Sequence, residues 1–160
     1  MTHLPFVEQF RDLPNIVHKS WEEITHATGM SYCNLRLYFK ETSNGEPRSP
    51  HLRTVREIAH CFDLIPVVLY HTATDQPETL GMDNLLAGEH VDDYVRRVIL
   101  QEKTRLRLSG STLAWRSGLS KQTVALYETS RNDLTVRSLD SLCVPLGLVA
   151  GYFVVKDLRL

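Results

Sequence analysis

The chain has 160 residues, of which 42% are hydrophobic and 23% are charged. This balance is typical of a folded protein with a core, and it excludes a disordered or fibrous chain. Apolar runs are much shorter than the roughly 18 residues that cross a bilayer, so we exclude a membrane-spanning protein. The first ten residues do not resemble a signal peptide. Three scattered cysteines are too few for a disulfide framework, which favours a reducing cytoplasm.

The formal net charge is −1, but this total hides an uneven distribution. Residues 103–137 carry seven basic and two acidic residues, and residues 31–56 carry five basic and two acidic residues. Residues 73–93 carry six acidic residues and neither Lys nor Arg. Chance variation on a mixed surface is one explanation. The other is that two basic segments, with fields of their own, are separated by an acidic one.

The chain also contains an internal repeat. The segment SWEEITHATGMSYCNLRLYF, from Ser20, aligns with SGSTLAWRSGLSKQTVALYE, from Ser109, at an offset of 89 residues. Further on, LRTVREIAHCFDL, from Leu52, aligns with VRSLDSLCVPLGL, from Val136, at an offset of 84. The first copy thus has five extra residues in ETSNGEPRSP, which its Asn-Gly and prolines predict to be a loop. A duplication with one loop insertion explains both offsets.

The first copy opens with a poor helix, because Pro14 interrupts the apolar pattern of its first residues. Ser20 and Ser31 are suited to N-caps and Gly29 to a C-cap, which predicts two short helices joined by a tight turn. The run 66–70 is rich in β-branched residues and predicts a strand. A third helix before that strand is predicted by apolar residues at helical spacing: Leu52, Val55, Ile58, Ala59 and Phe62.

The second copy has the same pattern of capping residues, with Ser109 and Ser120 suited to N-caps and Gly118 to a C-cap. A well-formed helix over residues 91–99 precedes it. A third helix begins near Val136, and we expect it to kink or to stop before Pro145. A strand is predicted over residues 152–155.

A single strand is not stable alone, so each predicted strand needs a partner. Pairing of the two strands within one chain would make the copies an intramolecular pseudo-dimer. Pairing between chains would make a homodimer. A third interpretation is that both runs are simply core segments, because short apolar runs are ambiguous.

The second copy, LSGSTLAWRSGLSKQTVALYETSRNDLTVRSLDSLCVPLGL, resembles the helix-turn-helix regulators of the Cro and phage-repressor type, the Xre family. Residues 21–64 of the first copy resemble them more weakly, and the strand endings are similar to those of some antitoxins of this family. The resemblance implies a mainly α fold of two tandem lambda-repressor-like helix-turn-helix units, each ending in a short strand. We expect the units at residues 1–72 and 89–160, with an acidic linker at 73–88. The markers are the helix pair around Gly118, the opening Ser120 and Thr123, and the Tyr127–Glu128 end.

Two positions depart from the family pattern. The family usually has Gln soon after the first cap, where this chain has Trp21 and Gly110. Phe39 stands where the second copy has Glu128, so the pair that we expect between Glu128 and Lys103 has no counterpart in the first copy.

The resemblance implies double-stranded DNA as the partner and transcriptional regulation, more often repression than activation, as the function. A recognition helix presents its N-terminal side chains to base edges in the major groove. In the second copy we expect contacts from Lys121, Gln122, Thr123, Ala125, Arg131, Asn132 and Arg137. The first copy could bind DNA weakly, bind it differently or serve only as a scaffold. Its candidate contacts are Tyr32, Asn34, Arg36, Lys40, Arg48 and Arg53.

Other classes of function find little support in the sequence. His and Cys residues lack a recognised metal-ligand spacing, and neither a phosphate-binding glycine loop nor a nucleophile elbow is present. We therefore expect that the protein is not an enzyme and that it binds neither a metal nor a cofactor. The alternative function is a protein-binding module, such as an antitoxin or anti-activator, built on the same fold.

Overall fold

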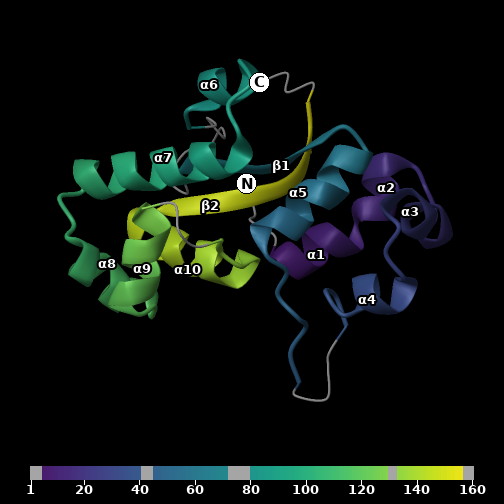
Figure 1. Cartoon of the computed structure of the whole chain (residues 1–160), viewed down its shortest axis with the longest axis horizontal. Helices are drawn as coiled ribbons and strands as arrows, with labels where there is room; N and C mark the ends of the chain where they lie inside the picture. The colour runs from purple at the N-terminus through teal and green to yellow at the C-terminus, as the bar shows by residue number, and fades with distance from the viewer. Residues whose placement is uncertain (1–4, 41–44, 72–79, 130–132, 157–160) are drawn as a thin grey trace.

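A two-stranded antiparallel sheet lies at the centre of the computed structural model, which describes residues 5–40, 45–71, 80–129 and 133–156 (Figure 1). Strand β1 spans Leu64–His71 and β2 spans Leu148–Val155. Both strands predicted from the sequence are confirmed, and each is longer than predicted. The two strands pair with one another inside the chain, so the pseudo-dimer arrangement is the one present.

The N-terminal half, residues 5–71, places a series of helices before β1. The early break predicted at Pro14 is present, because one helix ends at Arg11 and Pro14 lies in the first turn of the next. The third helix is confirmed, with four of its five predicted apolar residues buried. The helices are α1 (Phe6–Arg11), α2 (Leu13–Val17), α3 (Trp21–Thr28), α4 (Tyr32–Arg36) and α5 (Leu52–Cys61).

The C-terminal half, residues 80–156, repeats the order and ends in β2. Helix α7 corresponds to the helices that open the N-terminal half. It buries the apolar stripe that the sequence predicts. Part of the segment interpreted as an acidic linker is helical, and its Met82 is buried against Ile65 and Val68 of β1. The helices are α6 (Met82–Leu86), α7 (Val91–Arg105), α8 (Gly110–Ser117), α9 (Lys121–Glu128) and α10 (Val136–Leu146).

Both helix pairs have the predicted capping. Ser20 and Ser31 accept hydrogen bonds from first-turn backbone amides in α3 and α4, and Ser109 and Ser120 do so in α8 and α9. The turn after α8 is closed by Gly118, whose φ of 76° is a left-handed conformation that favours glycine. These caps give each half a helix, a tight turn and a second helix.

The third helix of the second copy was predicted to kink or to stop before Pro145, and it does not stop there. Helix α10 continues through Pro145 to Leu146 and ends at Gly147, which adopts the left-handed conformation with a φ of 67°. Pro145 lies in the last turn, so the helix loses only one amide donor there and has little length left to disrupt.

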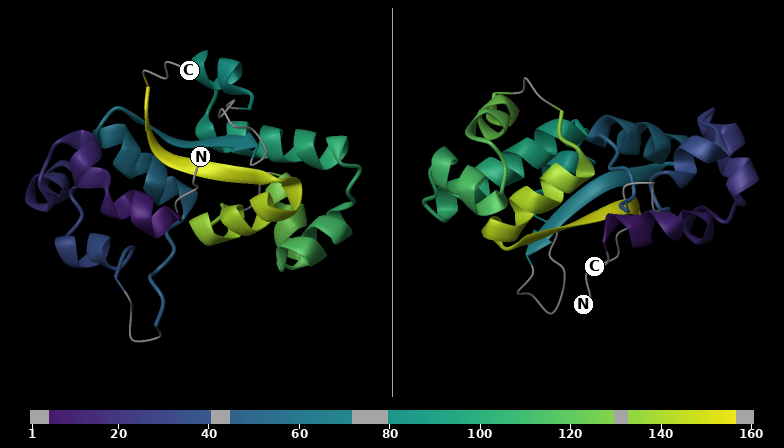
Figure 2. Two further views of the ribbon diagram at one scale, coloured as in Figure 1. Left: turned by 180° about the vertical axis from the view of Figure 1, so that it is seen from behind. Right: turned by 90° about the horizontal axis from the view of Figure 1, so that it is seen from below.

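The two halves share one hydrophobic core. Its buried residues come from α1 to α5, from α7 to α10 and from both strands. Seen from behind and from below, the halves lie at opposite ends of the molecule with the sheet between them (Figure 2). The sheet therefore fixes the position of one helix pair relative to the other.

Candidate nucleic-acid interface

The N-terminal turn of α9 presents polar side chains to solvent. Lys121, Gln122 and Ala125 are exposed, as the sequence predicts for base-reading positions. Thr123 is half-buried, and its hydroxyl lies 2.7 Å from that of the N-cap Ser120. The structure therefore brings three of the predicted residues onto one exposed surface and gives Thr123 a second task in the helix cap.

The opposite face of α9 holds the helix in the core. Val124 and Tyr127 are 2% and 3% exposed, as their spacing predicts. Burial raises the pKa of the Tyr127 phenol well above its ordinary value. A phenol that stays neutral and buried anchors this helix and leaves only its outer face for a partner.

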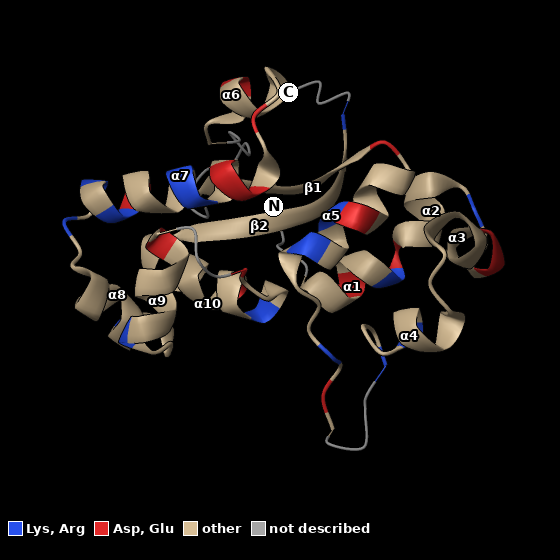
Figure 3. Ribbon diagram, viewed as in Figure 1, with Lys and Arg blue, Asp and Glu red and all other residues tan. Residues whose placement is uncertain are grey.

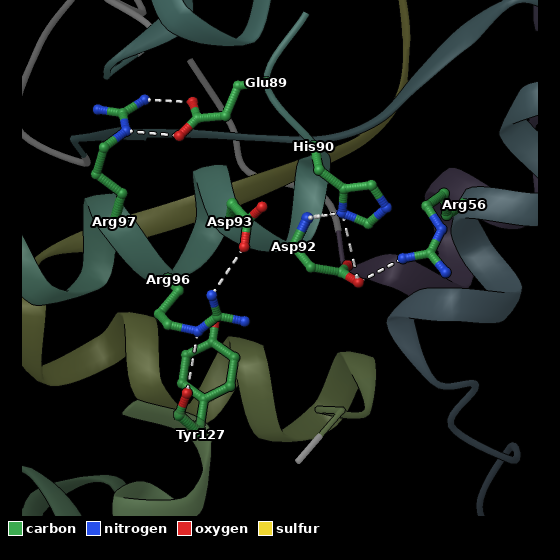
Figure 4. Close-up of polar contacts among 8 residues, drawn as sticks. All are labelled: Arg56, Glu89, His90, Asp92, Asp93, Arg96, Arg97 and Tyr127. Carbon is green, nitrogen blue, oxygen red and sulfur yellow. Dashed lines mark hydrogen bonds and ion pairs between the residues drawn. The ribbon is translucent and has the colours of Figure 1, made fainter. Parts of the chain in front are cut away.

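Helix α7 clamps the C-terminal end of α9 with two cations. Arg96 donates from Nε to the backbone oxygen of Tyr127 at 3.2 Å and is itself held by Asp93 at 2.9 Å (Figure 4). The expected pair is present, with Lys103 Nζ 2.7 Å from Glu128 Oε1. Cations at a helix C-terminus interact favourably with its dipole. Helix α7 thus fixes the orientation of α9.

The exposed side of α8 carries two residues that our sequence reasoning missed. Trp115 is 80% exposed, and Arg116 beside it is exposed as well, whereas Leu113 and Ala114 are buried. The signal was available, because both residues follow the buried positions and so fall outside the apolar stripe of this short helix.

In the N-terminal half, the predicted residues of α4 are also exposed. Tyr32 is 42% exposed, and Asn34 and Arg36 are exposed around the buried Leu35. Lys40, four residues beyond the end of α4, is exposed as well. Helix α4 has five residues against eight in α9, so it presents a shorter exposed surface.

The loop before α5 ties the two halves together. Arg48 is exposed, and its backbone amide donates to the Leu37 oxygen at 2.8 Å. Arg137 of α10 donates from its backbone to Ser49 Oγ at 2.9 Å and from Nη2 to the Pro47 oxygen at 3.2 Å. Arg137 is exposed but has these protein partners, so it also has a structural part in joining the halves.

The remaining predicted residues are Arg53, Arg131 and Asn132. Arg53 is exposed in the first turn of α5, and its backbone amide donates to Asp133 Oδ2 at 3.4 Å. Arg131 and Asn132 lie outside the described residues.

The two helix pairs differ in charge. In the aligned first turns, α3 carries Glu22 and Glu23 where α8 carries Ser111 and Thr112 (Figure 3). Hydrogen bonds from Ser20 lower the pKa of Glu23, so this carboxylate stays ionised at neutral pH. Two carboxylates repel phosphate, and the N-terminal pair is therefore the less favourable surface for a polyanion.

Within the described part of the chain, no group of three or more His, Cys, Asp or Glu residues could hold a metal ion. Among the same residues, none of the helices has the length and apolar character needed to cross a membrane.

Comparison with known proteins gives one relative. The chain is 36% identical over 64 residues to a protein of Rhodospirillum rubrum described as an uncharacterized transcriptional regulator in the ATPase CF(0) region. The match covers 40% of this chain and 59% of that protein. The chain matches no family model and no solved structure.

Proposed function

We propose that this protein is a sequence-specific DNA-binding transcriptional regulator that reads the major groove with α9. The observation that carries the proposal is the geometry of α9, which is anchored by its inner face and clamped at its C-terminal end, while Lys121, Gln122 and Ala125 face solvent at its beginning. The relative in Rhodospirillum rubrum, described as a transcriptional regulator, supports a regulatory role.

Each exposed residue of α9 has a contact that suits its chemistry. The amide of Gln122 can make a paired contact with adenine, and the ammonium of Lys121 can donate to guanine. The methyl groups of Ala125 and Thr123 suit apolar contact with the methyl group of thymine. Occupancy of an operator or promoter site then regulates transcription, and repression is the more common outcome in the family that the sequence resembles.

Cations near α9 would supply backbone contacts, which set register and affinity without reading sequence. Arg116 on α8 is exposed, and Arg131, Asn132 and Arg137 follow α9 in the chain. In this proposal residues 89–160 form the reading unit, and residues 1–72 form a second unit of weaker or different affinity.

The test is the salt dependence of binding to a duplex isolated from a random-sequence library. We expect the logarithm of the association constant to fall against that of the salt concentration with a slope of about −3 or steeper, because each neutralised phosphate releases counterions. A library that yields no enriched sequence, or a slope near zero, contradicts the proposal.

The matched variants are Lys121→Ala and Lys156→Ala. Both remove one exposed lysine, but Lys156 follows the end of β2 and pairs with Asp63. We expect Lys121→Ala to change the preferred base at one position, and Lys156→Ala to leave the base preference unchanged.

A second candidate function is a protein-binding module of the antitoxin or anti-activator kind. The observation that favours it is Trp115, because a tryptophan exposed to 80% is the kind of anchor that protein interfaces bury. Trp115→Ala distinguishes the two: it would abolish capture of a protein partner expressed from a neighbouring gene, whereas the base preference of the DNA reader would remain.

A further inference from the structure

The register of the sheet relates equivalent residues of the two copies. Val67 lies opposite Tyr152, and Val68 lies opposite Gly151. The offset of 84 that aligns the third helices also carries Val67 onto Gly151 and Val68 onto Tyr152. Exchange of the two copies therefore converts one residue pair into the other. A pseudo-two-fold axis passes between these pairs.

A second contact lies on the same relation. His51 and Thr135, which precede the third helices and are also 84 residues apart, face each other in an isolated antiparallel bridge. The same offset of 84 also relates the two backbone hydrogen bonds that flank this bridge, so that each corresponds to the other when the copies are exchanged. These bonds, each 2.9 Å long, run from Leu52 N to the Leu134 oxygen and from Val136 N to the Pro50 oxygen.

The outer edges of the sheet are occupied by side chains of the same chain. On β2, the Gln9 amide accepts from Tyr152 N at 2.7 Å and donates to the Ala150 oxygen at 3.4 Å, as a neighbouring strand would. On β1, the Tyr94 hydroxyl accepts from Leu69 N at 3.1 Å. Helix α1 thus covers β2, and α7 covers β1, so a helix of each half covers the strand of the other half. At these positions a second copy would find the edge already bonded.

The internal axis presents two different surfaces on one side of the molecule. Helices α4 and α9 both lie below the sheet in Figure 1, at opposite ends of the long axis. Their aligned exposed positions differ in chemistry: Lys121 corresponds to Tyr32, and Ala125 to Arg36. A two-fold symmetric DNA site needs the same chemistry twice, and this chain does not offer it.

We propose that one chain is the complete DNA-reading unit and that its operator is asymmetric, with one half-site read by α9 and an unlike half-site contacted by α4. The inference rests on the proposed function. Binding to the half-site at α4 would depend more on contacts with the DNA backbone, because Arg36 and Lys40 suit phosphates. The carboxylates of α3 would repel the phosphates and oppose a closer approach of the DNA to this helix pair.

The experiment is selection of binding sites from a random duplex library with the full chain and with two double variants. We expect the parent chain to select a consensus without two-fold symmetry. Lys121→Ala with Gln122→Ala should erase base preference in one half of that consensus, with a loss of about 5- to 150-fold in affinity for each lost base contact. Asn34→Ala with Arg36→Ala should change only the other half.

Lys156→Ala provides the matched control, and we expect it to select the consensus of the parent chain. All substituted residues are exposed, so circular dichroism should show the same helical content throughout. A palindromic consensus whose halves both change in the Lys121 and Gln122 variant would overturn this inference and leave the proposed function intact. Failure to enrich any sequence would overturn the proposed function and this inference with it.

Discussion

The two halves differ in the chemistry of one junction within the helix-turn-helix, between the start of its first helix and the end of its second. Where the first turn of α8 meets the end of α9, the C-terminal half has Gly110 and Glu128, and Lys103 of α7 reaches the carboxylate at 2.7 Å. At the aligned positions of the N-terminal half, Trp21 stacks on Phe39 with ring centroids 5.1 Å apart. One half closes this junction with an ion pair, and the other closes it with an aromatic stack.

The glycine lies against the ion pair. A Cβ atom added at Gly110 would lie 3.8 Å from Lys103 Nζ and 3.9 Å from Glu128 Oε1, so a side chain there would contact both members of the pair. In the N-terminal half, Trp21 fills the corresponding space, and Phe10 joins its cluster at 5.5 Å. The helix-turn-helix geometry thus accommodates either junction.

Truncation of the aromatic junction should have the largest effect. Phe10 is fully buried against rings from α3, β2 and the segment after α4, so Phe10→Ala should lower the free energy of unfolding by about 3–5 kcal/mol. Urea denaturation monitored by circular dichroism measures this change in the free energy of unfolding. Because the halves share one core, we expect a single transition, and Phe10→Leu should cost less. A loss below about 1 kcal/mol would show that the stack does not hold the N-terminal half.

Disruption of the ion-pair junction should cost less, because both of its side chains are partly exposed. Glu128→Ala should lower the free energy of unfolding by about 1–2 kcal/mol, since it leaves the Lys103 ammonium half-buried without this partner. Replacement of both members, Lys103→Met with Glu128→Leu, should restore stability to within about 1 kcal/mol of the parent chain. A double variant less stable than the single one would contradict the equivalence of the two junctions.

Exposure of the sheet edge should have a smaller effect on stability and a visible effect on association. Gln9→Ala removes both hydrogen bonds to β2 and should cost about 1 kcal/mol. The newly unpaired edge should favour self-association, which sedimentation velocity at increasing concentration would detect. Gln9→Glu is the informative control, because it keeps an acceptor for Tyr152 N but cannot donate to Ala150. An entirely monomeric Gln9→Ala chain would show that the edge is protected by other means.

The smallest expected effect is a difference in the response of the two helix pairs to acid. The pKa of Glu23 is lowered in the folded chain by its hydrogen bonds with Ser20, so its contribution is present above the unfolded pKa and is lost as pH falls through the folded value. The aligned residue in α8, Thr112, does not titrate. Amide exchange measured from about pH 6 to about pH 3 should therefore show α3 opening before α8.

The variant Glu23→Gln controls this experiment, because it keeps an acceptor for the Ser20 amide but does not titrate in this range. We expect its α3 to lose the added sensitivity to acid. Simultaneous opening of α3 and α8 in the parent chain would refute the role of the carboxylate.

Much of this fold could be predicted because local chemistry determines it. Ser20, Ser31, Ser109 and Ser120 cap helices in any tertiary context, and the spacing of apolar residues identifies the buried face of α5 and α7. The partner of each strand could not be predicted, because pairing within a chain and pairing between chains bury the same residues. The end of α10 was misjudged because Gly147, two residues after Pro145, is what ends the helix.

The candidate site was predictable in part for the same reason. The exposed positions of α9 follow from its cap and from its buried Val124 and Tyr127. The partners of Arg137 and the edge protection by Gln9 could not be predicted, because they join residues about 90 and 140 positions apart in the chain. Trp115 was missed although it falls outside the apolar stripe of its short helix.

The central claim is that one chain contains both reading surfaces, and native mass spectrometry of the complex tests it most directly. The chain, 18.3 kDa in mass, is titrated onto the duplex selected by the full chain. One chain per duplex at saturation, with protection of both halves of the site in a footprint, is the result that we predict. Two chains per duplex, each protecting one half, would contradict the account.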